Sequence, residues 1–102
     1  MIIPKRVTLC GREFKVVTDK KSGGGSFSEG KNLITIGTYY KEEIPEIFAH
    51  EIFEAILAIR DMRYALQRDQ ADNGDYKFVF SHKEFEQAMK DVCLAFKGTK
   101  FS

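Results

Sequence analysis

The chain has 102 residues, a formal net charge of +1 and a sequence pI near 7.7, and 43% of its residues are hydrophobic. This length predicts a single domain over residues 1–102 with a modest core. The near-neutral charge excludes a strong field that would attract nucleic acid or an anionic membrane. No apolar run approaches the about 20 residues that span a bilayer. We therefore expect a protein that binds neither nucleic acid nor membrane.

The two cysteines, Cys10 and Cys93, lie far apart and have no C-x-x-C spacing. Residues 1–9 contain too few apolar positions for a secretory signal. Because disulfides are rare in the cytosol, we expect two reduced thiols and a cytoplasmic location. One disulfide between the two cysteines is the alternative.

The first third of the chain predicts β-structure. Residues 6–9 and 13–18 are β-prone and flank a short turn that contains Gly11, which predicts a hairpin. Residues 19–28 have the composition of a loop, with three consecutive glycines at its centre. Residues 32–36 predict the next strand, and residues 25–29 are a candidate for its hairpin partner.

Two helices are predicted in the rest of the chain. The first extends from about Glu43 to about Tyr64, because acidic residues and Pro45 suit its first turn. Residues 69–75 are dense in turn formers and predict a loop, and residues 76–80 form a short β-prone run.

The last helix is predicted over residues 82–97. Ser81 and Glu84 form an S-x-x-E capping box, and Phe80 and Phe85 are placed as a hydrophobic staple. Apolar residues then recur every three or four positions, which predicts one buried stripe: Phe85, Ala88, Met89, Val92, Cys93 and Phe96. The expected fold class is α+β, with two helices packed on a small, twisted, mostly antiparallel sheet.

The most informative stretch is residues 47–59, which contain only three polar side chains: His50, Glu51 and Glu54. At about 100° per residue, all three fall on one narrow arc of an otherwise apolar helix. Such a helix is usually buried, and buried carboxylates are costly unless they are paired or bind a metal. The i, i+4 spacing also brings His50 next to Glu54, as in the H-E-x-x-H zinc helix.

The second histidine of the chain, His82, is the first residue of the last predicted helix. His50, Glu54 and His82 together would offer two imidazoles and one carboxylate with a fourth position open, which is the catalytic pattern for zinc. Glu51 would then be the general base. Two alternatives remain: His50 as a core or boundary residue without a ligand, and Glu86, four residues after His82, as the carboxylate ligand in place of Glu54.

Two short segments resemble the zincin metallopeptidases, specifically the minimal zincin-like proteins often encoded in phages and prophages. They are His50-Glu-Ile-Phe-Glu-Ala-Ile56 and Phe80-Ser-His82-Lys-Glu-Phe85. The resemblance implies that His50, Glu54 and His82 are metal ligands and that Glu51 is the general base. This chain has Glu54 where most such peptidases have His, so it carries H-E-x-x-E.

These observations lead to three functional hypotheses. The first is a zinc-dependent metallopeptidase or hydrolase that acts on a protein or peptide. The second is a non-catalytic zincin-like module that binds a protein partner. The third, a nucleic-acid binder built on Lys20, Lys21 and Lys31, is opposed by the near-neutral charge and by the lack of interleaved aromatic residues. The sequence does not define a substrate or an oligomeric state.

Overall fold

The computed structural model describes residues 1–65 and 76–101. Its main sheet has four strands, in the spatial order β1-β2-β4-β3: β1 (Arg6–Leu9), β2 (Arg12–Asp19), β3 (Gly25–Ser28) and β4 (Leu33–Gly37). The pairings β1–β2 and β3–β4 are antiparallel, whereas β2 and β4 are parallel. The predicted hairpin is confirmed, and so is the pairing of residues 25–28 with the strand that follows them.

Alternating side chains give the sheet one apolar face. In each central strand every second residue is buried, because successive side chains point to opposite faces. The register places Val7 opposite Phe14 and Val16 opposite Ile34, so the apolar residues of neighbouring strands meet. The buried residues of the sheet are Val7, Leu9, Phe14, Val16, Ile34 and Ile36.

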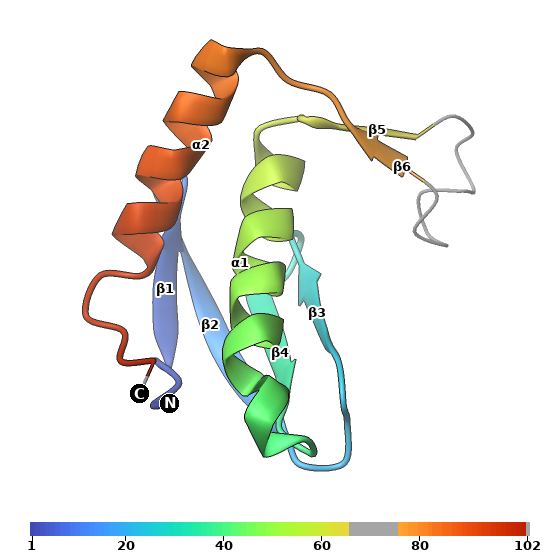
Figure 1. Ribbon diagram of the computed structural model, residues 1–102, viewed down its shortest axis with the longest axis vertical. Helices are drawn as coiled ribbons and strands as arrows, with labels where there is room; N and C mark the ends of the chain where they lie inside the picture. The colour runs from blue at the N-terminus through green and yellow to red at the C-terminus, as the bar shows by residue number, and fades with distance from the viewer. Residues whose placement is uncertain (66–75, 102) are drawn as a thin grey trace.

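Two helices cover this apolar face and run in opposite directions (Figure 1). A short 3₁₀ turn (Lys41–Glu43) leads into α1 (Ile44–Ile59), which packs over β3 and β4. The second helix, α2 (His82–Ala95), packs beside β1. This two-layer arrangement confirms the predicted α+β class.

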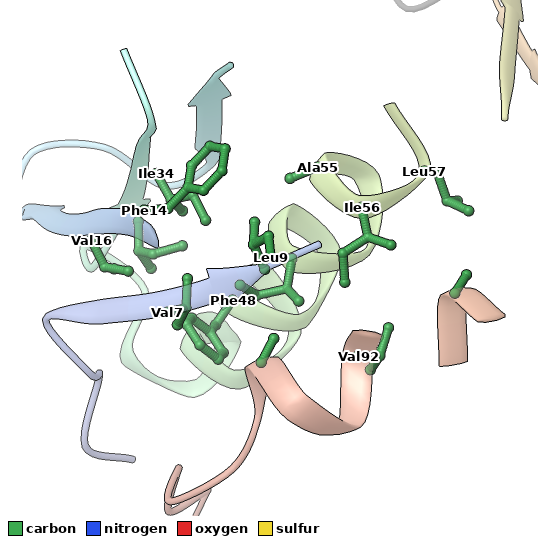
Figure 2. Packing of buried hydrophobic residues seen from close by; sticks show 14 of the residues in the cluster. Val7, Leu9, Phe14, Val16, Ile34, Phe48, Ala55, Ile56, Leu57 and Val92 are labelled. Atoms are coloured by element: carbon green, nitrogen blue, oxygen red, sulfur yellow. The ribbon is translucent and has the colours of Figure 1, made fainter. Parts of the chain in front are cut away.

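The core fills the space between the helices and the sheet, as Figure 2 shows. Phe48 is fully buried, and its ring lies 5.7 Å from the ring of Phe96 and 6.2 Å from that of Phe101. Ile52 and Ile56 follow it at i+4 and i+8 and are also fully buried. One side of α1 is therefore anchored firmly in the core.

The first helix ends earlier than predicted, at Ile59 and not near Tyr64. Asp61 has a left-handed backbone conformation with φ 60°, and the Met62 N–H donates to the Leu57 carbonyl at 2.8 Å. This is the hydrogen bond of a Schellman motif, which closes a helix. The sequence did not reveal the end because glycine, not aspartate, is the usual residue in that conformation.

A separate two-stranded sheet lies beyond the end of α1 (Figure 1). It pairs β5 (Arg63–Ala65) with β6 (Tyr76–Phe78) in antiparallel fashion. The β-prone run predicted near residue 76 is thus confirmed as a strand. The loop predicted at 69–75 lies outside the described residues.

The start of α2 agrees with the prediction, and its buried face agrees in part. The capping box between Ser81 and Glu84 is present in both directions. Phe85, however, is 43% exposed, and Cys93 is exposed as well. Ala88 and Val92 of the predicted stripe are buried and Phe96 packs against the core, and the buried face also contains Asp91 and Ala95. Small residues let α2 approach the sheet closely, which leaves the larger Phe85 at the open end of the helix.

Asp91 is the buried charge that the sequence did not predict. Its carboxylate accepts two hydrogen bonds from Arg60, at 2.5 and 3.0 Å, and one from the Cys10 thiol at 3.6 Å. Burial, followed by the Asp91 charge, raises the pKa of the Cys10 thiol. The cluster connects the β1–β2 turn, the end of α1 and α2, and a protonated thiol there is a structural group and not a nucleophile.

Candidate metal centre

The i, i+4 spacing on α1 brings His50 and Glu54 together as predicted. Their Nε2 and Oε2 atoms lie 2.7 Å apart, and the Glu51 Oε2 atom lies 3.9 Å from the same His50 nitrogen. One donor atom from each of His50, Glu51 and Glu54 falls within 4.8 Å of the others. The donor set comprises one imidazole nitrogen and two carboxylate oxygens.

This donor set could hold a metal ion. Imidazole and carboxylate are both zinc ligands in proteins, and two ligands on a tetrahedral ion with bonds of about 2.0–2.2 Å lie about 3.3–3.6 Å apart. The observed separations of 2.7 and 3.9 Å fall on either side of that range. The group of three is therefore a candidate metal centre.

The three side chains differ sharply in exposure. The Glu51 side chain is 8% exposed and that of Glu54 18%, whereas that of His50 is 61% exposed. The prediction of a buried arc is therefore correct for the glutamates and wrong for His50. The physical reason is the orientation of α1: its core side is set by Phe48 and Ile52, and His50 points away from both.

An open cleft of about 340 Å³ lies beside His50 and Glu51, between the first half of α1 and the start of β3. Its walls are formed by Gly24, Gly25, Glu43, Glu46, Ile47, His50 and Glu51. A Cβ atom at Gly25 would lie 2.8 Å from the Glu51 Cγ atom and 3.0 Å from Ile47. A side chain larger than that of glycine would thus displace the strand from Glu51 and from the wall of the cleft.

Glu51 is the electrostatically unusual member of the group. Burial raises its pKa above the ordinary value for glutamate; the neighbouring His50 offsets part of this effect, and the Glu54 charge adds to it. Within the described residues its carboxylate makes no hydrogen bond, and His50 is its one ion-pair neighbour. A buried carboxylate of this kind, at the wall of a cleft, is suited to accept a proton.

His82 is not a member of this group. Its Nδ1 atom lies 3.1 Å from the Glu86 carboxylate, and the two side chains are 84% and 62% exposed. Figure 1 shows that α2 begins at the end of the molecule where α1 ends, whereas His50 belongs to the first half of α1. The structure thus brings His50, Glu51 and Glu54 together and leaves His82 with Glu86.

Two further carboxylates, Glu43 and Glu46, line the cleft and were not predicted to take part in the site. Their sequence positions indicate only the acidic first turn of a helix. Their spacing from His50 is i−7 and i−4, which places all three on one side of a helix. That periodicity was visible in the sequence, but the position of β3 opposite it was not.

No protein-family model, no curated protein and no solved structure matches this chain. The resemblance to zincins therefore depends on the segments 50–56 and 80–85 alone. In the part of the chain that the structure describes, no helix is both long enough and apolar enough to cross a membrane.

Proposed function

We propose that the chain is a zinc-dependent hydrolase that acts on a peptide segment, with His50 and Glu54 as ligands and Glu51 as the general base. The observation that carries the proposal is the group of three donor atoms within 4.8 Å at a cleft. Zinc, when bound, would lower the pKa of water to about 7 and polarise a carbonyl group. Everything else in the mechanism comes from side chains of this chain.

Glu51 is the residue that would move protons. Its raised pKa means that it holds a proton more readily than an ordinary glutamate does. It would take a proton from water as the water oxygen bonds to the carbonyl carbon. It would then donate that proton to the nitrogen that leaves when the C–N bond breaks. Its position at the wall of the cleft gives it access to a bound substrate.

The sheet offers a site for the peptide itself. β3 is an edge strand, and its first residue, Gly25, lines the cleft. An extended peptide can add to such an edge through backbone hydrogen bonds. Because Gly25 has no side chain, the peptide backbone would lie close to the α1 residues that act on it.

The second candidate is a non-catalytic module that binds a protein partner. Two observations favour it: His82 lies outside the donor group, and several large apolar residues between β6 and the first turns of α2 are exposed. These exposed residues are Phe78, Val79, Phe80 and Phe85. In this case the helix would keep its His and Glu residues without carrying out hydrolysis.

One variant distinguishes the two candidates. We expect the zinc-loaded chain to cleave an unbiased library of quenched fluorogenic peptides, with zinc content measured by elemental analysis on the same sample. Glu51→Gln should retain zinc and lower the cleavage rate at least about 100-fold, because it keeps the shape and removes the base. Glu13→Gln, which changes an exposed carboxylate on β2, is the matched control and should alter neither quantity.

Three outcomes contradict the proposal in different ways. Zinc uptake without cleavage by the wild-type chain favours the non-catalytic module. Loss of zinc in Glu51→Gln makes Glu51 a ligand and leaves the site without a base. Cleavage that persists unchanged in that variant removes Glu51 from the mechanism.

A further inference from the structure

The cleft beside α1 has a strongly acidic wall. Three of its lining residues are glutamates, Glu43, Glu46 and Glu51, and no lysine or arginine is among the lining residues that the structure describes. The Glu43 and Glu46 carboxylates make no hydrogen bond or ion pair with any described residue. Both are exposed to solvent at the rim of the cleft.

Acidic residues in the first turn of a helix have an ordinary explanation, because they complement the helix macrodipole. That explanation does not cover Glu51, which lies two turns further on and is almost completely buried. Its carboxylate lines the cleft without a hydrogen bond to any described residue. The acidic character thus continues from the rim to a buried group at the wall.

A bound metal would not cancel this charge. Four carboxylates surround the donor group and the cleft, namely those of Glu43, Glu46, Glu51 and Glu54. Against a divalent ion they leave about two negative charges on the wall, in a concave site where field lines are focused. An imidazole that ligates a metal is neutral, so a metal-bound His50 would leave that balance unchanged.

We infer that the cleft selects a peptide segment with a positively charged side chain, which Glu43 and Glu46 bind. This inference deepens the proposed function, because it names the substrate class for the same cleft. Along α1, Glu46 precedes His50 by about 6 Å, and Glu43 lies directly before the first residue of the helix. Alternate side chains of an extended peptide are about 6.8 Å apart. A lysine or arginine near the bond acted upon therefore reaches these carboxylates, whereas an acidic side chain is repelled.

The test measures binding, so it does not depend on hydrolysis. The probes are two fluorescein-labelled octapeptides, (Thr-Lys)₄ and (Thr-Gln)₄, titrated with the zinc-loaded full chain at an ionic strength of about 0.1 M and followed by fluorescence anisotropy. We expect the lysine peptide to bind at least about tenfold more tightly, because charge complementarity favours it. Glu46→Gln and Glu43→Gln should each weaken its binding about threefold to tenfold.

Glu13→Gln is the matched control, since it removes one negative charge from an exposed position on β2. It should leave the preference for lysine within about twofold, since charges beyond a Debye length of about 10 Å are largely screened. If the peptide is attracted only by the overall negative charge of the surface, Glu43→Gln, Glu46→Gln and Glu13→Gln should weaken its binding equally. This result would overturn the inference. Equal affinity for the two peptides, or binding of neither, would also overturn it. Zinc titration of the same samples reports on the metal centre separately, so the two proposals fail independently.

Discussion

Each helix carries a histidine four residues before a glutamate, yet the two pairs lie in very different surroundings. His50 and Glu54 of α1 lie beside the buried Glu51 and an open cleft. His82 and Glu86 of α2 are 84% and 62% exposed and lie next to other charged side chains of the helix surface. Identical spacing therefore produces a candidate metal centre in one helix and a solvated ion pair in the other. Burial of a third ionisable group makes the difference.

The two helices also differ in how deeply their side chains are buried in the core. α1 is anchored by fully buried residues such as Phe48, Ile52 and Ile56. α2 faces the core with Ala88, Val92 and Ala95, and its largest residue near the start, Phe85, is 43% exposed. Residues on α1 are consequently held in place more firmly than residues at the beginning of α2. This favours α1 as the element that positions a site.

The largest effect that we expect from this comparison is on stability. Phe48→Ala should lower the free energy of unfolding by about 3–5 kcal/mol, because it leaves a cavity under α1. Phe85→Ala, the matched change in α2, should lower it by about 1 kcal/mol or less, since Phe85 is 43% exposed and its ring stacks on that of Phe80. Urea denaturation followed by circular dichroism measures both. Equal losses would mean that the two helices are buried to the same extent.

A smaller effect concerns the buried carboxylate. Because the folded-state pKa of Glu51 is raised, the folded chain binds a proton more readily than the unfolded chain does. Its contribution to stability is therefore greatest below the unfolded pKa of about 4.5 and is lost as the pH rises through the folded value. Glu51→Gln should remove that loss and stabilise the metal-free chain by about 0.5–2 kcal/mol at pH 7.

This prediction is checked by denaturation of the metal-free chain at pH 4, 5, 6 and 7. The stability difference between Glu51→Gln and wild type should grow with pH over this range. Glu86→Gln, which removes an exposed carboxylate of α2, is the comparison variant. A difference that shrinks with increasing pH would mean that the Glu51 carboxylate is stabilised by its surroundings and not destabilised.

Much of the fold follows from local patterns in the sequence. Two β-prone runs around a turn that contains Gly11 predict the hairpin, and the capping box at Ser81 predicts the start of α2, because both signals depend on neighbouring residues only. The end of α1 at Asp61 depends on a backbone conformation that aspartate adopts rarely, so composition did not reveal it. The burial of Asp91 depends on Arg60, a partner 31 residues away.

The candidate site is also partly predictable, because some of its contacts depend only on local helical spacing. The contact between His50 and Glu54 is a property of helical spacing and was expected. The sequence does not predict which side of α1 faces the core, because apolar residues surround the helix on nearly all sides. With His50 taken as zero, the buried residues Phe48, Ile52 and Ala55 lie at about 140–200°, which turns His50 outwards and leaves Glu51 at the boundary.

The position of His82 depends on how α2 is oriented relative to α1. That orientation arises from long-range packing, and short segments of sequence do not encode it. The resemblance to zincins predicts His82 as a ligand, whereas the group of donor atoms that could hold a metal consists of the α1 residues His50, Glu51 and Glu54. The two alternatives predict different zinc affinities for the variants His50→Ala and His82→Ala.

The central claim is that His50, and not His82, carries the metal centre, and zinc affinity tests it most directly. We would titrate the metal-free chain with zinc in competition with a chromogenic chelator, for wild type, His50→Ala and His82→Ala. We predict that His50→Ala lowers zinc affinity at least about 100-fold and that His82→Ala changes it by less than about threefold. Equal losses in the two variants, or no zinc binding by the wild-type chain, would contradict the account.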